Sequence, residues 1–472
     1  MPSLQDKIAD RTAHVAVIGL GYVGLPLATA FAKAGFRVSG IDLDQRKVDA
    51  IAAGETYIPD VPQEELAPHV EAGRLTAASD YEGIGECDAI FICVPTPYDV
   101  QRAPDLSFIR SASRSIMTRL QPGQLVVLQS TTYPGTTEEV VLPILEESGL
   151  KAGEDFYLAF SPERIDPGNT QWTAYNTPKV VGGLTPACCE LAADLLRKMG
   201  AVVHPVSSTR AAELTKLLEN TFRAVNIALV NELALLSERM GIDFWEVIDA
   251  AKTKPFGFMP FYPGPGVGGH CIPVDPYYLF WKAREYDFYT KFIELAAEVN
   301  EAMPYHVVEL VTRALSAQGQ PLSGSRVLVL GVAFKPDVDD PRNSPAKRVM
   351  ELLRVRGADV VYHDPYVPRF RIGDDVFHRD PVEMASVELT DEALDEADCA
   401  VIVTGHRAVD YERVLKRAPC VVDTCNATAD TEGGRDGVVR LGAGELGSKG
   451  AGEQGAGSLE REASAGCGTS AG

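Results

Sequence analysis

The feature that most constrains the fold is a strand that runs directly into a glycine-rich turn and a helix near the N-terminus. Residues 14–18 (HVAVI) are apolar, and GLGYVG follows with glycines at Gly19, Gly21 and Gly24 before a helical pattern begins. In a G-x-G-x-x-G turn these glycines permit a tight turn, a close backbone approach to a pyrophosphate, and close helix–strand packing, respectively. The motif predicts a dinucleotide site, although a tight turn that binds nothing remains an alternative.

The second strand, FRVSGIDLD, ends on acidic residues and indicates which dinucleotide binds. Asp42 lies 18 residues after Gly24, where a carboxylate can accept both ribose hydroxyls. An acid at that position repels a 2′-phosphate, so NAD is favoured over NADP. The nearby Arg46 leaves NADP open.

Strand–helix alternation occurs at both ends of the chain and is interrupted in the middle. Apolar runs at 87–96 and 124–132 continue the N-terminal alternation, and runs such as 326–335 resume it, which predicts parallel βαβ units. Between them, 209–241 contains no glycine or proline before Gly241 and predicts one helix of roughly 45 Å. A helix of that length is typical of a domain connector or a dimer interface.

The predicted fold class is therefore α/β, with two Rossmann-like doubly wound domains joined by a long central helix and a helical middle domain. We expect an NAD-binding domain at 1–206, a helical dimerisation and catalytic domain at 207–320, and a second Rossmann-like domain at 321–440. That second domain has a single glycine, Gly331, after its first strand, so we do not expect it to bind a dinucleotide in the same way. Residues 441–472 lack aromatic residues and predict a disordered, dispensable tail.

Charge and composition exclude several classes of protein. The 44 Lys and Arg against 66 Asp and Glu give a net charge of −22, which argues against binding to nucleic acid or anionic lipid. No apolar run reaches the 18 or so residues of a membrane span, and the polar N-terminus lacks the apolar core of a signal peptide. The nine Cys include no CxxC pair and the eight His show no metal-ligand spacing. We expect a cytoplasmic protein without a metal site.

A loop dense in glycine and proline contains the strongest candidate nucleophile. In PGPGVGGHCIPVDP (263–276), the glycines let the backbone fold around a ligand and leave the thiol of Cys271 accessible. Asp275, four residues later, is a candidate for proton transfer. The alternative is that Cys271 is a small core residue.

The long helix carries a polar stripe. Lys216, Asn220 and Arg223 lie at i, i+4 and i+7 and share one face, which Glu213 extends. A lysine beside an apolar wall could serve as an acid or base. A solvated helix face remains the alternative.

Further candidates follow strands. Glu163 and Arg164 lie in a proline-flanked loop, SPERIDPGN, whereas Thr96 and Thr132 close two strands at their carboxyl ends, where α/β sheets bind ligands.

In the C-terminal domain, FKPDVDDPRNSPA carries Lys335 and Arg342 after a strand, and this pair could clamp a diphosphate.

Together these motifs resemble the nucleotide-sugar 6-dehydrogenases, the family of UDP-glucose and GDP-mannose dehydrogenases. The resemblance covers about residues 12–440 and rests on seven ordered motifs: GLGYVGLPLA, VPTP, STTYPGTT, SPER, AELTKLLENTFR, GVGGHCIPVDP and AFKPDVDDPRNSPA. Within the family, the segments around Glu163 and Cys271 look most like those of UDP-N-acetylglucosamine 6-dehydrogenases of surface-polysaccharide biosynthesis. UDP-glucose dehydrogenases more often have other residues where this chain has His270 and Val274.

The resemblance implies a four-electron oxidation of the sugar C6 hydroxyl to a carboxylate with two NAD per turnover. Cys271 would attack the C6 aldehyde to give a thiohemiacetal, which is oxidised to a thioester and then hydrolysed. Lys216 and Asp275, with a water, would serve proton transfer and oxyanion stabilisation. Glu163 would assist hydrolysis and Thr132 would position the water.

The same resemblance implies two binding sets, a UDP-sugar substrate, and a homodimer or higher homo-oligomer built on the long helix. The cofactor would be bound by Gly19, Gly21, Tyr22, Val23, Gly24, Asp42, Arg46, Thr96, Thr132 and Arg342. The substrate would be bound by Glu163, Arg164, Lys216, Asn220, Arg223, Tyr262, Gly268 and Lys335, with Asn220 also in the catalytic set.

One departure concerns the partner subunit. Many relatives supply a basic residue from the partner sixteen positions before the Cys, and this chain has Pro255 there, next to Lys254.

The identity of the sugar is the least determined part of the prediction. The segment PFGFMPFYPG supplies an apolar wall for an N-acetyl group, formed by Phe256, Phe258, Met259, Phe261 and Tyr262. These residues could instead pack a domain junction. The alternatives are the same reaction on UDP-glucose, UDP-N-acetylmannosamine, UDP-N-acetylgalactosamine or GDP-mannose, a two-electron sugar-alcohol dehydrogenase, and a non-catalytic NAD-binding scaffold.

Overall fold

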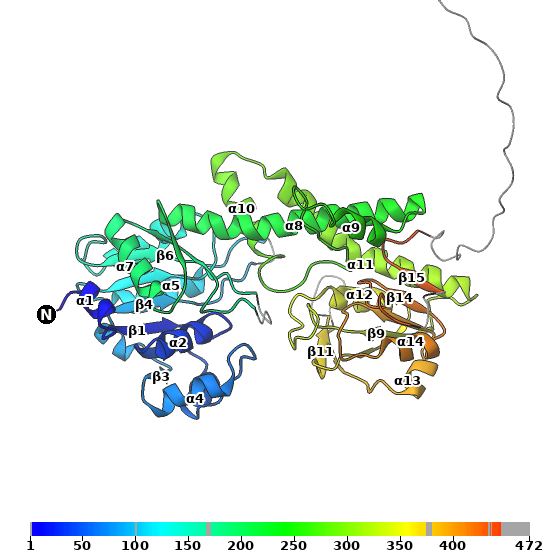
Figure 1. Cartoon of the computed structure of the whole chain (residues 1–472), viewed down its shortest axis with the longest axis horizontal. Coiled ribbons are helices and arrows are strands. Elements are labelled where there is room, and N and C mark those ends of the chain that lie inside the picture. Colours follow the sequence, from blue (N-terminus) through cyan, green and yellow to red (C-terminus); the bar gives the residue numbers. More distant parts are fainter. Residues whose placement is uncertain are drawn as a thin grey trace, which may run out of the picture.

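The computed structural model describes residues 2–99, 102–166, 171–373, 380–432, 435 and 437–444. Two α/β lobes lie at either side of the molecule, and one long helix runs along the top from the N-terminal lobe to the C-terminal lobe (Figure 1). The predicted fold class is confirmed.

The N-terminal lobe is built on one eight-stranded sheet. In spatial order its strands are β3 (Leu75–Ala78), β2 (Arg37–Ile41), β1 (His14–Ile18), β4 (Ala89–Ile92), β5 (Leu125–Leu128), β6 (Tyr157–Phe160), β7 (Lys179–Gly183) and β8 (Val203–Val206). Neighbouring strands pair in parallel except β6 and β7, which are antiparallel. The strand order reverses between β1 and β4, and the carboxyl edge of a sheet at such a reversal is where α/β folds bind ligands.

Helices cover both faces of this sheet because successive strand residues point to opposite sides. Val15 and Val17 of β1 join one core cluster, whereas Ala16 and Ile18 join the other. The helices of this lobe are α1 (Leu4–Ala9), α2 (Gly24–Lys33), α3 (Gln45–Ala52), α4 (Gln63–Glu71), α5 (Ser107–Met117), α6 (Leu142–Glu146) and α7 (Pro186–Arg197).

The long central helix α8 spans Thr209–Met240, within one residue of the predicted range. The Ser208 hydroxyl caps its start by accepting from the backbone N–H of Ala211, and Gly241 ends it with a left-handed φ of 71°. Its first half contributes Leu217 to the N-terminal core, and its second half contributes Ala234 to the C-terminal core. The helix therefore belongs to both lobes and holds them in place.

The remaining helices of the middle region are α9 (Phe244–Ala251), α10 (Asp275–Ala283) and α11 (Lys291–Ala317). Of these, α11 packs along α8 and carries the chain into the C-terminal lobe (Figure 1). The glycine-rich loop between α9 and α10 contains Cys271.

The C-terminal lobe repeats the architecture on a smaller scale. Its parallel sheet has the order β10 (Asp359–His363), β9 (Arg326–Leu330), β13 (Cys399–Ile402), β14 (Val421–Asp423) and β15 (Val438–Arg440), and β11 (Arg369–Ile372) forms a hairpin with β12 (Val382–Ala385). Its helices are α12 (Pro345–Val355), α13 (Asp391–Asp395) and α14 (Tyr411–Arg417).

The predicted tail boundary at 441 is wrong by four residues. Leu441 is fully buried in the C-terminal core, and its carbonyl accepts from the indole N–H of Trp245 at 2.8 Å. The N–H of Gly442 donates to Glu238 at 2.8 Å. Residues 441–444 therefore pack against α8 and α9, and the rest of the predicted tail, 445–472, lies outside the described residues.

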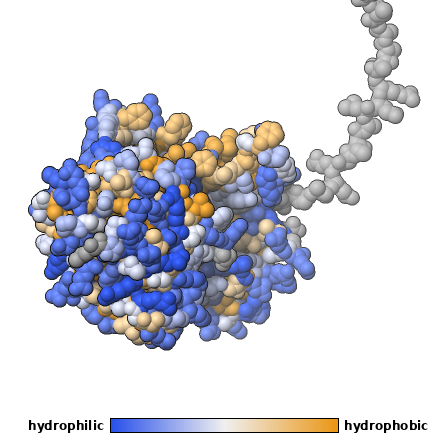
Figure 2. All heavy atoms as spheres, turned by 60° about the vertical axis from the view of Figure 1, so that its left-hand side comes forward, coloured by the Kyte–Doolittle hydropathy of each residue, from blue (hydrophilic) through white to orange (hydrophobic). Residues whose placement is uncertain are grey.

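One side of α8 is exposed and apolar. Figure 2 shows hydrophobic residues gathered along the upper part of the molecule, where α8 runs in Figure 1. The exposed apolar residues of α8 recur at intervals of three, four or seven: Leu214, Leu218, Phe222, Leu229, Leu233, Leu236 and Met240. Among the described residues, no helix is both long enough and apolar enough to span a membrane.

Candidate active site

A cavity of about 1830 Å³ lies where the two lobes and the middle region meet. The carboxyl edge of the N-terminal sheet forms one wall, α8 and the glycine-rich loop around Cys271 form another, and the segment between β9 and α12 closes it. Most of the residues that sequence reasoning selected line this one cavity.

The glycine turn after β1 has the geometry that a dinucleotide needs. Gly19 adopts a φ of 87°, and a Cβ added to Gly24 would lie 1.7 Å from the Gly19 carbonyl oxygen. A Cβ added to Gly21 would meet no atom within 4 Å, because that backbone faces open cavity. The first and third glycines are thus required by the turn and its packing, and the second leaves room for a phosphate.

Asp42 and Arg46, both predicted to bind the cofactor, behave differently. Asp42 lines the cavity, where its carboxylate accepts from the Leu20 N–H and from Lys47 Nζ, both at 2.8 Å. The Arg46 side chain is 91% exposed and pairs with Asp44 instead, so it does not line the cavity. A closer carboxylate holds its guanidinium outside the cavity, and its predicted contact with the cofactor stays a prediction.

Three of the other residues predicted to bind the cofactor line the cavity, and Thr132 does not. Tyr22, Val23 and Thr96 line the cavity as predicted, but Thr132 is buried and its hydroxyl contacts that of Thr136 at 2.9 Å. Thr131 lines the cavity in its place. The predicted roles of Thr132 in cofactor binding and in positioning a water stay predictions.

Four predicted catalytic residues gather on the wall formed by α8 and the glycine-rich loop. Cys271 and Asp275 are joined by a turn in which the Asp275 N–H donates to the Cys271 carbonyl at 2.8 Å. Asn220 on α8 donates to the Asp275 carboxylate at 2.5 Å, and Lys216 lies one helical turn before Asn220. All four line the cavity.

Burial raises the pKa of both titratable groups of the loop. It raises the pKa of the Cys271 thiol to about 11, an effect that Asp275 reinforces and Lys216 opposes. Burial also raises the pKa of Asp275 to about 6, although Lys216 and the Asn220 hydrogen bond act against it. A carboxyl with that pKa is ionised at neutral pH and can accept a proton.

Glu163 is held in a buried network that includes two residues missed from the sequence. Lys179 Nζ contacts both carboxylate oxygens, at 2.8 and 2.9 Å, and Gln129 Nε2 donates to Oε2 at 2.9 Å. The backbone N–H groups of Arg164 and Ile165 donate to Oε1 at 2.8 and 3.1 Å. Burial works against the charge, but Lys179 and the other donors outweigh it and lower the pKa of Glu163.

Three predicted anion-binding cations line the cavity with carboxylate partners. Arg164 pairs with Glu219 at 2.5 Å. Lys335 contacts Asp166 at 2.8 Å. An anionic ligand would have to share these cations with the carboxylates or displace them.

The third of these cations, Arg342, makes a bidentate contact with Asp340 and lies 4.6 Å above the ring of Tyr22. Burial opposes the charge of Asp340, but His270, whose Nε2 lies 3.2 Å from the carboxylate, and hydrogen bonds from Arg342 lower the pKa of that carboxyl. Arg223 also lines the cavity, and its side chain is exposed.

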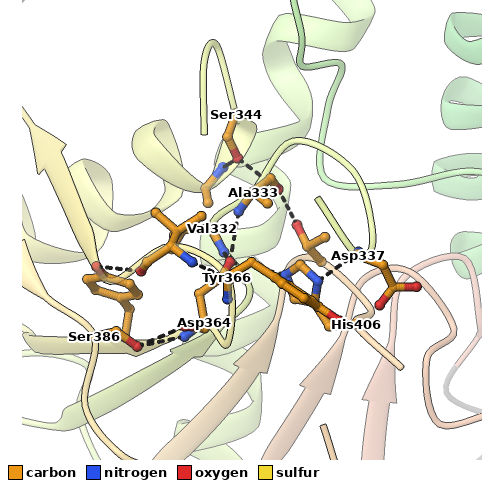
Figure 3. Close-up of polar contacts among 12 residues, drawn as sticks. Val332, Ala333, Asp337, Ser344, Asp364, Tyr366, Ser386 and His406 are labelled. Carbon is orange, nitrogen blue, oxygen red and sulfur yellow. Dashed lines mark hydrogen bonds and ion pairs between the residues drawn. The ribbon is translucent and has the colours of Figure 1, made fainter. Parts of the chain in front are cut away.

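A buried network in the C-terminal lobe fixes the segment that carries Lys335 and Arg342 (Figure 3). Asp364 Oδ2 accepts from the N–H groups of Val332 and Ala333 at 2.7 and 3.0 Å and faces His406 Nε2 at 3.1 Å. His406 Nδ1 accepts from the Asp337 N–H at 2.9 Å. A side-chain carboxylate therefore accepts from the backbone N–H groups that follow β9.

Within a single chain, only one residue of the predicted apolar wall lines the cavity. Tyr262 lines the cavity, but Phe256, Phe258 and Met259 are exposed and lie outside it. Phe261 packs on Phe222, with ring centroids 5.7 Å apart.

Of the other predicted residues near that segment, one lines the cavity and two do not. Gly268 lines the cavity, and a Cβ there would meet Phe334 at 2.8 Å. Lys254 and Pro255 are exposed and do not line it.

Three family domains match the chain in the order that the structure displays. The NAD binding domain of the UDP-glucose/GDP-mannose dehydrogenase family matches residues 13–200, the central domain 210–302, and the UDP binding domain 328–430. The chain belongs to this family. The predicted resemblance is thereby confirmed, and so is NAD as the cofactor.

Relatives within the family act on several acetamido sugars. The chain is 41% identical over 359 residues to a UDP-N-acetyl-D-glucosamine 6-dehydrogenase of Pseudomonas aeruginosa, which covers 76% of this chain and 84% of the relative. It is 35% identical over 427 residues to an NDP-N-acetyl-D-galactosaminuronic acid dehydrogenase of Ralstonia nicotianae, covering 87% and 95%. A solved structure of a UDP-D-ManNAc dehydrogenase from Pyrococcus horikoshii superimposes with a TM-score of 0.82 at 33% identity, covering 92% of this chain and all of that one. The chain is a nucleotide-sugar dehydrogenase.

Sequence reasoning missed Lys179 and Gln129 in this dehydrogenase, although each left a signal. Lys179 is the one charged residue in the strand KVVGG, and a fully buried lysine needs a partner. Gln129 follows the apolar strand β5 at the ligand-binding edge. Neither signal indicates Glu163 as the partner, because Gln129 follows β5, Glu163 follows β6, and Lys179 begins β7.

Proposed function

We propose that this dehydrogenase oxidises the C6 hydroxyl of UDP-N-acetylglucosamine to a carboxylate in two successive NAD-dependent steps, for polysaccharide biosynthesis. The observation that carries the proposal is the gathering of Cys271, Lys216 and Asp275 on one cavity that also contains the glycine turn of the NAD binding domain. A two-electron alcohol dehydrogenase would have no use for a thiol at that position.

NAD, when bound at the Gly19–Gly24 turn, accepts a hydride from the sugar C6 carbon in each oxidation. In the first oxidation Asp275 takes the hydroxyl proton through a water, and the Lys216 ammonium stabilises the developing negative charge on oxygen. The Cys271 sulfur then adds to the aldehyde carbon, and its proton moves to the aldehyde oxygen to give a thiohemiacetal. Loss of the second hydride and of the hydroxyl proton leaves a thioester on Cys271.

Water completes the reaction by hydrolysis. The water oxygen bonds to the thioester carbon, the carbon–sulfur bond breaks, one water proton returns to Cys271, and the other leaves as the acid ionises. The covalent link keeps the aldehyde from escaping between the two oxidations.

The choice of sugar rests on sequence similarity to relatives. The 41% identity to a UDP-N-acetyl-D-glucosamine 6-dehydrogenase supports an N-acetylglucosamine substrate. Other relatives, at 35% identity, are named for N-acetylmannosamine and N-acetylgalactosaminuronic acid sugars, so these sugars remain alternative substrates. All three classes carry an acetamido group, which argues against UDP-glucose.

The test is a panel of nucleotide sugars assayed for NADH formation. UDP-N-acetylglucosamine should exceed UDP-glucose in kcat/KM by about tenfold or more, which corresponds to about 1.4 kcal/mol. The panel should include UDP-N-acetylmannosamine, UDP-N-acetylgalactosamine and GDP-mannose. A higher kcat/KM with any of these would replace the sugar in the proposal and leave the chemistry intact.

A further inference from the structure

The segment that closes the cavity from the C-terminal lobe holds the loop of Cys271 by its backbone. The Gly269 N–H donates to the Arg342 carbonyl at 3.1 Å, and the Asn343 side-chain amide donates to the Gly269 carbonyl at 3.0 Å. Gly269 is buried, so both of its polar backbone groups need such partners. We call this pair of hydrogen bonds the Gly269 clamp. It fixes the peptide two positions before the candidate nucleophile.

The loop lies this close to the C-terminal lobe because it presents glycines to it. Gly269 adopts a left-handed φ of 85°, and a Cβ there would lie 3.0 Å from the ring of Phe334. A Cβ added to Gly268 would lie 3.1 Å from the Asn343 carbonyl oxygen. The amino side of Cys271 therefore rests directly on the C-terminal lobe.

The residues that follow Cys271 belong to the N-terminal lobe. The Cys271 carbonyl accepts from the N–H groups of Val274 and Asp275 at 3.1 and 2.8 Å, at the start of α10. Val274 and Tyr278 lie in the core of the N-terminal lobe. Cys271 is therefore held between the lobes, by one on its amino side and by the other on its carboxyl side.

The two lobes bind different reactants. The family domain in the N-terminal lobe binds NAD, and the one in the C-terminal lobe is a UDP binding domain. Asp275, which serves the first oxidation in the proposed function, is held on the N-terminal side by Asn220 at 2.5 Å. The thiol acts only after an aldehyde has formed. It is thus the reacting group whose place depends on the Gly269 clamp.

We propose that Asn343 is a positioning residue that ties the Cys271 loop to the lobe that binds UDP, so that the thiol is placed against C6 of a sugar bound there. The inference rests on the proposed function, because it assigns a residue to its thiol step.

Asparagine suits this position in two ways. Its φ of 52° is left-handed, a conformation that asparagine adopts more readily than most residues, and its amide supplies the donor to Gly269. The next residue, Ser344, caps α12 by accepting from the Ala346 N–H at 3.2 Å. The amide is therefore presented from a fixed helix end.

The test is Asn343→Gly, which keeps the left-handed backbone and removes the amide. With the loop less firmly placed, the thiol should capture the aldehyde less often while the first oxidation continues. Some aldehyde should then leave the enzyme, with one NADH formed for each molecule that escapes, so that NADH per sugar consumed falls from two toward one. Formation of the uronic acid should slow about tenfold, and KM for either ligand should change by less than about threefold.

Two measurements follow the variant. Free aldehyde is reduced with borodeuteride after the protein is removed, which returns it to the nucleotide sugar with one deuterium at C6 for mass spectrometry. The second measurement is independent of the reaction and follows the rate at which iodoacetamide alkylates Cys271. A loosened loop should expose the thiol and raise that rate about three- to tenfold over wild type.

Asn426→Gly is the matched control. Asn426 is also left-handed, with a φ of 57°, and lies in the same lobe, but its side chain contacts Arg435 at 3.1 Å and not the loop. This variant should make two NADH per sugar and keep the wild-type alkylation rate. If Asn343→Gly fails to fold, Asn343→Asp tests the same contact, because aspartate tolerates the backbone and its carboxylate cannot donate to Gly269. It should release aldehyde and speed alkylation in the same way.

The inference requires both aldehyde release and faster alkylation. Two NADH per sugar without aldehyde, or a wild-type alkylation rate, would overturn it. A KM raised by more than about threefold for NAD or the sugar would also overturn it, because the amide would then bind that ligand directly. A wild-type enzyme that itself makes one NADH per sugar would instead refute the proposed function, and the alkylation rates alone would then decide whether Asn343 holds the loop.

Discussion

Among single residues, Asp275 is the one whose surroundings most directly set the conditions for catalysis. Its carboxyl is buried at the first position of α10, beside Cys271 and under the amide of Asn220. Burial raises its pKa to about 6, close to neutral pH. The proposed reaction needs the ionised form, because only that form accepts a proton.

We therefore expect activity to fall with an acid limb near pH 6. The pKa is raised, so Asp275 becomes protonated as the pH drops through about 6 and not near its ordinary value of 3.8. Below that pH, kcat/KM should fall about tenfold per pH unit, and Asp275→Asn should lose about 100-fold or more at pH 8. The measurement is kcat/KM against pH from 5 to 9.

The pH profile of Asn220→Ala, compared with that of the wild type, tests whether Asp275 sets the acid limb. Asn220 donates to the Asp275 carboxylate and favours its ionised form, so removing that donor should move the acid limb to higher pH. A limb that stays near pH 4 in wild type, or does not move in Asn220→Ala, would show that Asp275 is not the proton acceptor.

At the scale of elements, α8 combines a polar catalytic stripe with an exposed apolar one. The apolar stripe runs from Leu214 to Met240 at helical spacing, and its side chains are exposed. Exposed apolar residues in such a row are typical of an interface between protein chains. The position and spacing of the stripe lead us to expect that a second copy of the chain covers it.

Leu229→Glu should break that dimer. Leu229 is in the middle of the stripe and 52% exposed, so the change introduces a charge into the interface without disturbing the core. Multi-angle light scattering at micromolar concentration should give a dimer or larger assembly for wild type and a monomer for the variant. Val202→Glu, at an exposed apolar residue away from α8, should leave the assembly unchanged. Monomeric, fully active wild type would contradict the expectation.

The short C-terminal segment 441–444 should be required for stability although the residues beyond it are dispensable. Truncation after residue 444 should leave melting temperature and activity unchanged. Truncation after residue 440 removes Leu441, which is fully buried, and with it the acceptor for Trp245. Losing a buried leucine alone costs about 2–5 kcal/mol. Equal melting temperatures for the two truncations in thermal denaturation would contradict this.

Across the whole molecule, the sequence patterns predict much of the fold because its boundaries have local causes. Ser208 and Gly241 cap α8, and the glycines after β1 impose the turn into α2, so both element boundaries follow from nearby residues. The antiparallel β7 is not predictable in this way, because its direction depends on how it packs between β6 and β8.

The site was less predictable wherever a role depends on a partner distant in the sequence. The spacing after β2 predicts a cofactor contact for Arg46, whereas in the structure its guanidinium pairs with Asp44, two residues before it. The Glu163–Lys179–Gln129 network joins residues that follow or begin three strands, and no local pattern pairs them. Cys271 and Asp275, by contrast, lie in one turn and could be paired from spacing alone.

The most direct test of the account is the ratio of NADH formed to nucleotide sugar consumed by the purified protein. NADH is followed by absorbance, and the sugar and its products are quantified by chromatography in the same reaction. Because the proposal is a four-electron oxidation through a thioester on Cys271, we expect two NADH per UDP-N-acetylglucosamine, a uronic acid product, and no aldehyde in solution. One NADH per sugar, accompanied by free aldehyde, would contradict the central claim.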